Sequence, residues 1–422
     1  MSVPLDRLYN YLNDIVKYNL LIYGWMPHGS TKLEDFCMLM DHMTPEDWLE
    51  LRSKTTLQEF KLLTSRNDHA VMICHDQEPL NFDRYSFEDF QRIIKQHHQK
   101  YREKLQIDNI DRQSVVNYYA RLGLRGLTIP TNHYDHTLLL HSEKNSLHVA
   151  QYSQQGYVPV YYWSHGVIAL DWFRYAEHDP KLQLDPVKIQ QDFLIYNRAW
   201  SGTREYRLCF TEQIVQHNLV ENCKMSFNAH DDMHYTQHCF VNPEFEISKH
   251  DIHNFFPVNT HSSVASANYC VEDYVSTGIE IVLETLFDDA RWHLTEKSLR
   301  PIACGQPFML MATPGSLIYL RQYGFKTFDG LIDETYDGIH NPRQRLQAVI
   351  AEMKRISSLP AQQKIKLFNS LNSIAKFNKQ LFFNKFSSKL INEYKQNMDS
   401  AMIEMNQHHH GRTCAVITQL MQ

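Results

Sequence analysis

Short apolar runs alternate with stretches of helical period along much of the chain, most clearly between residues 279 and 324. The apolar positions there predict a strand over 279–286, a helix over 295–304, a strand over 307–312 and a helix over 316–323. Ser316 is expected to cap the second helix, and Gly324 to end it. Strands that alternate with helices in this way are typical of a parallel sheet with helices on its faces.

The same pattern recurs on both sides of this segment. Further strands are predicted over 20–25, 70–74, 137–141, 158–163 and 193–196. Further helices are predicted over 5–18, 45–52 and 86–105. Another follows the segment 197–207 and runs to about residue 219, and a last helical region runs from 343 to 406 with a break at 359–360. A polar stretch over 177–186 marks the expected domain boundary. The sequence therefore predicts an α/β protein.

Length and composition narrow the class of protein. The chain has 422 residues, 43% hydrophobic and 21% charged, which is typical of two or three folded domains. No run of 18 apolar residues occurs and the N-terminal segment is charged, so we expect no signal peptide and no membrane anchor. The eight cysteines are scattered without a CxxC pair, which indicates reduced thiols and a cytoplasmic location. No pattern indicates an oligomeric state.

Thr295, Glu296 and Lys297 lie at the predicted start of helix 295–304, where a parallel sheet binds its ligands. A carboxylate there can accept hydrogen bonds from a ribose diol, and a cation can hold a diphosphate. The sequence therefore predicts a nucleotide-binding site, and we include Arg300 from the same helix. The alternative is that Glu296 is a charge favoured at a helix N-terminus and Lys297 a solvated lysine.

A second candidate for phosphate binding follows strand 193–196. A Ser-Gly-Thr turn opens a helix there, with Arg198 before it and Arg204 after it. Backbone N–H groups and guanidinium groups both suit phosphate oxygens. Arg204 and Arg207 are three residues apart and can share a helix face. The alternative is that they pair with Glu205 or Glu212 on the surface.

Three titratable side chains follow strand 70–74 directly: His75, Asp76 and Glu78. A half-buried carboxylate or imidazole in such a loop can act as a general base. The alternative is a polar loop in which Asp76 caps a turn. His28 and His165 lie in loops predicted after strands 20–25 and 158–163, and such loops can approach a ligand closely.

Two further polar stretches, 228–234 and 354–395, have compositions that can suit a metal ion or a polyanion. Acidic and histidine residues gather over 228–234 without the fixed spacing of a metal site, so no metal is predicted. The segment 354–395 carries nine basic residues and one acidic residue, a local charge of 9 − 1 = +8 in a chain of net charge −6, which leaves −14 elsewhere. Such a segment can contact a polyanion, or it can be a solvated face.

Three separated motifs match one known group. They are Glu78-Pro79 after a strand, Asn197 followed by Arg204 after 204 − 197 = 7 positions, and Leu294-Thr-Glu-Lys297. With these motifs the chain resembles the α1,3-fucosyltransferase-like glycosyltransferases. It more closely resembles glycosyltransferases of large tailed bacteriophages, over 75–80, 193–207 and 295–337. Gln77 and Leu80 depart from the fucosyltransferase pattern, so a fucose donor is not carried over.

The resemblance implies a GT-B fold, with two Rossmann-like domains that face each other across a cleft. The acceptor domain would be 1–180 and the donor domain 188–345, with the helices of 346–422 crossing back over both. The implied activity is inverting, metal-independent transfer of a sugar from a UDP- or GDP-linked donor, without a cofactor.

The resemblance also implies roles for residues. Glu78 would be the base, with Asp76 and His75 as substitutes, and His28 and His165 would lie on the acceptor side of the site. Glu296 would hold the ribose, and Lys297, Arg204 and Arg198 the diphosphate. The implied acceptor is hydroxymethylated cytosine in double-stranded phage DNA, as for an arabinosyltransferase-like enzyme. The alternatives are a cell-surface glycan or lipopolysaccharide precursor as acceptor, and a nucleotide-binding protein without catalytic activity.

Overall fold

The computed structural model describes residues 12, 15, 20–25, 36–38, 70–75, 137–154, 157–197, 204–227 and 268–420. For 20–25, 36–38, 70–75, 137 and 406–420 it describes the backbone alone. The chain divides into two compact units. Unit 1 comprises Met1–Val3, Ser142–Leu147 and Trp163–Glu393, and unit 2 comprises Pro4–His141, His148–Tyr162 and Tyr394–Gln422.

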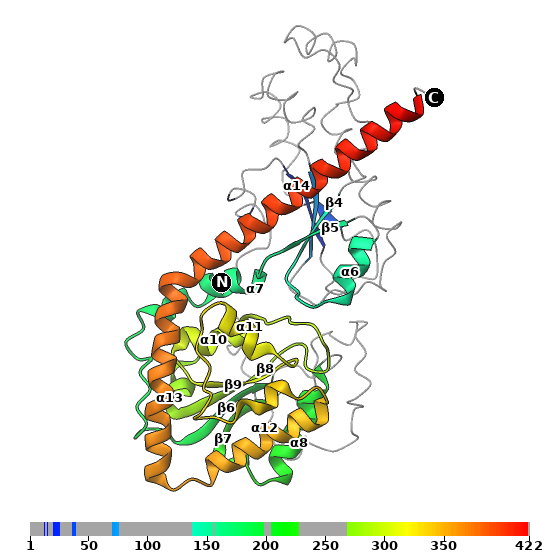
Figure 1. Ribbon diagram of the computed structural model, residues 1–422. Helices are drawn as coiled ribbons and strands as arrows, with labels where there is room; N and C mark the ends of the chain where they lie inside the picture. Colours follow the sequence, from blue (N-terminus) through cyan, green and yellow to red (C-terminus); the bar gives the residue numbers. More distant parts are fainter. Residues whose placement is uncertain are drawn as a thin grey trace. The chain divides into compact units, whose positions relative to one another are not determined.

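Unit 1 contains a four-stranded parallel sheet in the order β7-β6-β8-β9 (Figure 1). Its strands are β6 (Gln191–Asn197), β7 (Cys223–Phe227), β8 (Thr277–Leu283) and β9 (Phe308–Met311). The chain runs from β6 outward to β7 and then returns to the other side of β6 to form β8. The strand order therefore reverses between β6 and β8, and ligands of open parallel sheets bind beyond the carboxyl ends of strands at such a reversal.

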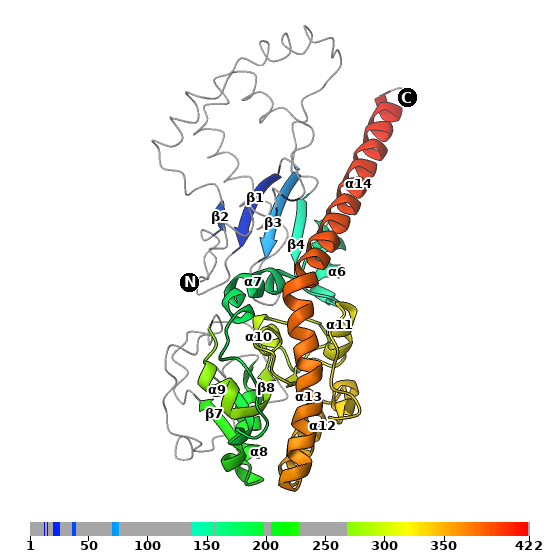
Figure 2. The same ribbon diagram turned by 90° about the vertical axis from the view of Figure 1, so that its left-hand side faces the viewer.

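Helices lie on both sides of this sheet (Figure 1). They are α7 (Ser164–Trp172), α8 (Tyr206–Gln216), α9 (Val271–Ser276), α10 (Glu296–Cys304), α11 (Ser316–Gln322), α12 (Pro342–Ser357) and α13 (Ala361–Leu381). α12 packs against α8 and β9, while α10 packs against β8, α7 and α13. A π-helical turn, η11 (Phe382–Phe386), leads into the long helix α14 (Ser387–Leu420), seen in Figure 2.

The inner strand β8 and the neighbouring strand β9 are buried because helices cover both faces of the sheet. All seven residues of β8 are buried. Gly278 is required there, since a Cβ atom at this position would lie 2.6 Å from Cε1 of Phe368 in α13. The four residues of β9 are buried as well. This is the continuous hydrophobic pattern of strands in a covered parallel sheet.

Unit 2 contains a five-stranded sheet in the order β2-β1-β3-β4-β5. Its strands are β1 (Leu20–Trp25), β2 (Phe36–Met38), β3 (Ala70–His75), β4 (Thr137–His141) and β5 (Tyr157–Tyr161). β2 pairs antiparallel with β1, and the other pairings are parallel. The helix α6 (Leu147–Gln154) connects β4 to β5. Asn397 of α14 donates a hydrogen bond of 2.7 Å to the Tyr161 carbonyl at the end of β5.

The prediction of an α/β fold with parallel sheets is confirmed. The seven strands predicted from apolar runs are β1, β3, β4, β5, β6, β8 and β9. Two short strands, β2 and β7, were not predicted. The predicted helices over 5–18, 45–52 and 86–105 lie outside the described residues, apart from Leu12 and Ile15, which are helical. Among the described residues, no helix combines the length and apolarity that crossing a membrane requires.

Three local predictions were wrong. Residues 164–166 begin α7 instead of forming a loop. The predicted strand over 279–286 ends at Leu283, because the chain leaves the sheet where the Glu284 carboxylate turns toward α10. Ser316 does not cap α11. The capping position is Gly315, at a φ of 82° that favours glycine, and Ser316 Oγ donates to the Thr313 carbonyl instead.

Candidate functional site

The first turn of α10 begins where the sequence predicted it. Thr295 is the N-cap residue, and its Oγ1 accepts a hydrogen bond of 3.3 Å from the Lys297 N–H. Ser and Thr are favoured at this position because their oxygen satisfies an N–H group that the helix leaves without a partner. Glu296 and Lys297 are thus the first two helical residues, at the edge formed by the carboxyl ends of β8 and β9.

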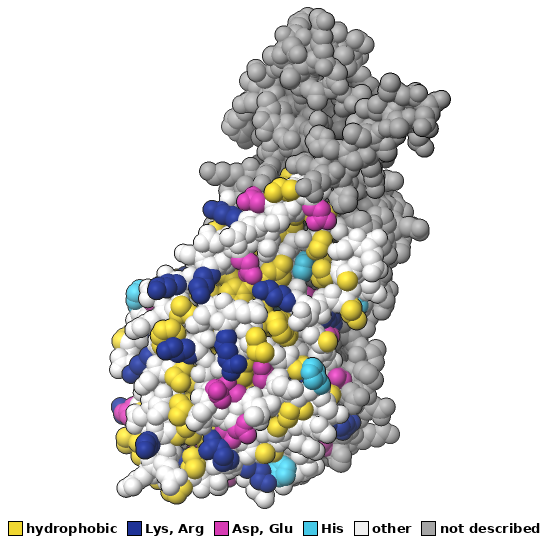
Figure 3. Space-filling view, viewed as in Figure 1, with side chains coloured by type: hydrophobic (Ala, Val, Ile, Leu, Met, Phe, Trp, Pro, Cys, Tyr) yellow, Lys and Arg dark blue, Asp and Glu magenta, His cyan; other side chains and the backbone are white. Residues whose placement is uncertain are grey.

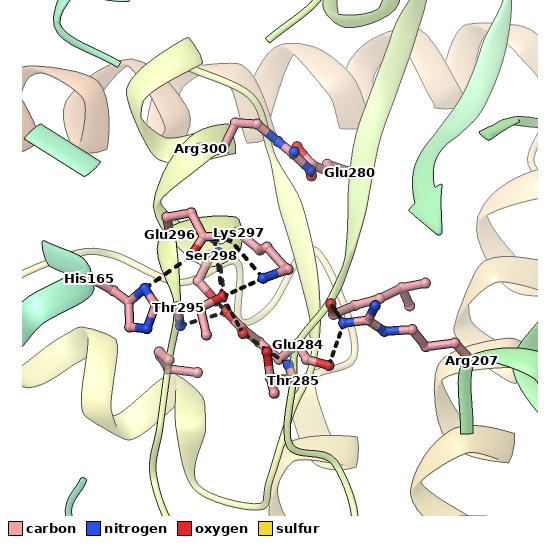
Figure 4. A network of polar contacts seen from close by, with 12 residues as sticks. His165, Arg207, Glu280, Glu284, Thr285, Thr295, Glu296, Lys297, Ser298 and Arg300 are labelled. Carbon is pink, nitrogen blue, oxygen red and sulfur yellow. Dashed lines mark hydrogen bonds and ion pairs between the residues drawn. The ribbon is translucent and has the colours of Figure 1, made fainter. Parts of the chain in front are cut away.

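A carboxylate of the protein itself occupies the N-terminus of α10 (Figure 4). Glu284, the residue after β8, is completely buried. Its Oε1 accepts hydrogen bonds from the backbone N–H groups of Thr295 at 3.0 Å and Ser298 at 3.2 Å. The hydroxyl groups of Thr295 and Ser298 donate to the same carboxylate. These N–H groups therefore serve Glu284, and an anionic ligand at this site has to be bound by side chains.

Glu296 lies between the side chains of Lys297 and His165. Its Oε1 is 2.9 Å from Nζ of Lys297, and its Oε2 is 2.9 Å from Nδ1 of His165 (Figure 4). Burial by itself raises the pKa of the Glu296 carboxyl group, but Lys297 and His165 outweigh it and hold the pKa well below its ordinary value. Glu296 is therefore ionised at neutral pH, and both of its oxygens face a positive or hydrogen-bonding partner.

Two arginines precede and open α8. Arg204 and Arg207 are both buried. Nη2 of Arg207 donates to the carbonyl oxygens of Leu283 at 2.7 Å and Glu284 at 2.9 Å, so it caps the carboxyl end of β8. Burial lowers the pKa of Arg207, and the charge of Arg204 adds to this lowering. The like charges of the two guanidinium groups repel each other, and the negative charge of Glu284 acts on Arg207 in the opposite direction.

The start of α8 is anchored to three strands. The Tyr206 hydroxyl group donates to the carbonyl oxygen of Glu284 at 2.6 Å, and it lies 3.3 Å from that of Met311 at the end of β9. Asn197, the last residue of β6, donates to Thr211 Oγ1 at 3.3 Å. Asn197 and the start of α8 therefore lie at the carboxyl edge of the sheet, next to Glu284, the residue after β8.

Arg300 is buried, and its guanidinium group is bound by side chains of unit 1. Its Nη2 is 2.6 Å from Oε1 of Glu280 in β8, and its Nε donates to the Tyr274 hydroxyl group at 3.1 Å. Its guanidinium also stacks 4.4 Å from the ring of Tyr196. Burial alone lowers the pKa of Arg300, but Glu280 outweighs it and raises the pKa well above its ordinary value. These contacts hold α10 against β8.

Several predicted site residues lie outside the described residues. They are His28, Asp76, Glu78 and Arg198. His75 is the last residue of β3, and its backbone alone is described. The acidic and histidine stretch over 228–234 is likewise outside the described part. Among the described residues, no group of three or more His, Cys, Asp or Glu side chains is arranged to hold a metal ion.

The basic segment over 354–395 is partly neutralised within unit 1. Arg355 pairs with Glu352 at 2.6 Å, and Lys364 pairs with Asp192 at 2.7 Å. Lys389 donates to the Tyr323 carbonyl at 2.8 Å. On the face drawn in Figure 3, described basic side chains are interspersed with acidic and hydrophobic ones. The local charge of the sequence therefore overstates the positive surface that this segment presents.

Sequence reasoning missed Glu284 and the pairing of His165 with Glu296. The only signal for Glu284 was a carboxylate at the end of a mostly apolar strand that also contains Glu280. For His165 there was no local signal, since its partner is 131 positions away in the sequence (296 − 165 = 131). No family model matches the sequence, and comparisons with curated proteins and with solved structures found no match either.

Proposed function

We propose that the protein is an inverting glycosyltransferase of the GT-B type, which transfers a sugar from a nucleoside-diphosphate donor to a hydroxyl group. The two α/β units would be the two halves of such an enzyme, with the donor held by unit 1. One observation carries the proposal: the ionised Glu296–Lys297 pair and the buried Arg207, which donates to the Glu284 carbonyl, lie at the edge of the sheet where the strand order reverses.

Each of these groups has a chemical task in the proposal. Glu296 accepts hydrogen bonds from the ribose. Lys297, Arg204 and Arg198 bind the diphosphate, while Arg207 holds the end of β8 and adds positive charge. Cationic side chains can neutralise the departing diphosphate without a metal ion. Arg300 is not part of the proposal, because its guanidinium pairs with Glu280.

In the proposed reaction the acceptor oxygen attacks the anomeric carbon of the donor sugar. The bond between that carbon and the diphosphate oxygen breaks, and its electron pair leaves with the diphosphate. Glu78 takes the proton of the acceptor hydroxyl group, with Asp76 or His75 as substitutes. Attack opposite the leaving group inverts the configuration at the anomeric carbon.

The assay for this proposal is release of UDP or GDP from a panel of nucleotide sugars, with and without acceptors. We expect Glu78→Gln to lower transfer by a factor on the order of 10² or more, because a general base contributes about that much. Glu221→Gln, at an exposed glutamate of unit 1, is the matched control and should leave the rate unchanged. Turnover of Glu78→Gln near that of the wild type would remove Glu78 from the role.

For the acceptor we propose hydroxymethylated cytosine in double-stranded DNA. This part of the proposal rests on the resemblance to phage enzymes and on exposed lysines of the basic segment, among them Lys366, Lys376, Lys385 and Lys395. Mass spectrometry of nucleosides from hydroxymethylated duplex DNA should find a mass increase of one sugar residue, and unmodified DNA should show none. A sugar transferred only to glycan or lipopolysaccharide precursors would contradict the DNA acceptor.

A further inference from the structure

His165 contacts a residue of the proposed donor site. The sequence suggested the acceptor side for it, but its Nδ1 lies 2.9 Å from Oε2 of Glu296. We propose that His165 is a positioning residue of the donor site, which fixes the Glu296 carboxylate for a ribose diol and so makes the site select ribonucleotides over 2′-deoxyribonucleotides. This inference rests on the proposed function and extends it to the class of nucleotide.

The two partners of Glu296 determine how its carboxylate can bind a ligand. An ionised carboxylate is an acceptor with two oxygens and about four lone-pair sites. Lys297 occupies one site on Oε1 and His165 one site on Oε2. Each oxygen therefore retains acceptor capacity, and the two oxygens together match the two neighbouring hydroxyl groups of a ribose. Without the imidazole, the carboxylate would be held at Oε1 alone and could rotate.

The residues near His165 in the sequence, Trp163 and Gly166, are held in place by contacts of their own. The indole Nε1 of Trp163 donates to the Leu294 carbonyl at 2.7 Å, which ties the start of α7 to the segment before α10. A Cβ atom at Gly166 would lie 2.9 Å from Cδ1 of Leu390, so the helix packs closely there. The ring of His293 stands perpendicular to that of His165, with centroids 5.4 Å apart.

This packing distinguishes a positioning role from a loose surface contact. The His165 and Glu296 side chains are only 3% and 5% exposed, so water does not compete strongly for the pair. A binding group whose orientation is locked by its neighbours loses less entropy when the ligand arrives. The ribose 2′-hydroxyl group would then meet a preorganised acceptor, and its removal would leave that buried acceptor without its donor.

The test compares affinities for UDP and 2′-deoxy-UDP, and for GDP and 2′-deoxy-GDP, by calorimetry on the full chain. We expect the wild type to prefer the ribonucleotide by about 10-fold, the cost of leaving a buried polar group unpaired. His165→Leu should reduce that preference toward one. His165→Gln, which keeps an N–H donor, should retain part of it. His178→Leu, at a histidine whose side chain is 84% exposed, is the matched control.

The outcomes separate this inference from the proposed function. If the wild type binds no nucleoside diphosphate, both are contradicted. If it binds them and His165→Leu keeps the full preference for ribonucleotides, the inference about His165 alone is wrong. Should His165→Leu fail to fold, the ratio in His165→Gln decides: a preference equal to that of the wild type and of His178→Leu overturns the inference.

Discussion

Two buried glutamates at the N-terminus of α10, Glu296 and Glu284, show which predictions about single residues were right and which were wrong. The change of apolar period correctly placed Thr295, Glu296 and Lys297 at the start of α10. It also suggested that this N-terminus was open to a phosphate, but Glu284 occupies it. Apolar periodicity shows which face of a helix or strand is buried. It does not show that the Glu284 side chain contacts the Thr295 N–H, 11 positions later in the sequence (295 − 284 = 11).

Replacement of Glu284 by glutamine tests this role. Glutamine has one oxygen and an NH₂ group, so it cannot accept all of the hydrogen bonds from Thr295 and Ser298. We expect Glu284→Gln to lower the free energy of unfolding by on the order of 2 kcal/mol, the cost of buried donors left without an acceptor. Urea unfolding measures the change, with Glu221→Gln as the control. Equal stability of the two variants would show that α10 does not depend on Glu284.

Element boundaries were predicted better than the contacts that hold the elements. The strands β8 and β9 were found because all of their residues are buried and most are apolar. β7 was missed because only its two end residues are buried, so its pattern does not stand out. The cap of α11 was misassigned to Ser316. In the structure the Leu317 N–H faces the carboxylate of Asp337, 3.2 Å from each oxygen and 20 positions away.

Asp337 gives a pH-dependent prediction for α11. Burial, assisted by the nearby charge of Glu334, raises the pKa of Asp337 from 3.8 to about 6, although the Leu317 N–H acts in the opposite direction. Because the folded pKa is above the unfolded one, the contribution of Asp337 to stability is full below about pH 4 and is lost as the pH rises through 6.

The neutral variant Asp337→Asn should therefore be more stable than the wild type at pH 8, by up to about 3 kcal/mol, and the gain should shrink toward pH 4. Thermal unfolding across this pH range measures the difference. Asp329→Asn, at an exposed aspartate of the same unit, is the control. A gain that does not depend on pH would contradict the assignment to Asp337.

At the scale of the whole molecule, the alternation of strands and helices was sufficient to predict parallel sheets, and both units contain one. The reversal of strand order between β6 and β8 was not visible in the sequence, because sheet order depends on long-range packing. This reversal matters most for function, since it brings Asn197, Arg207 and Glu284 to one edge with the first turn of α10. The proposal that unit 1 binds a nucleoside diphosphate depends on this arrangement.

Calorimetric titration of the full chain with UDP and GDP tests that claim most directly, in the wild type and in Lys297→Ala. Lys366→Ala, at an exposed lysine of α13, is the matched control. We predict that the wild type and the control bind at least one of the two nucleotides with equal affinity, and that Lys297→Ala binds it about 10-fold or more weakly through loss of a charge-assisted contact. Equal affinity of Lys297→Ala and the control, or no binding of either nucleotide by the wild type, would contradict the account.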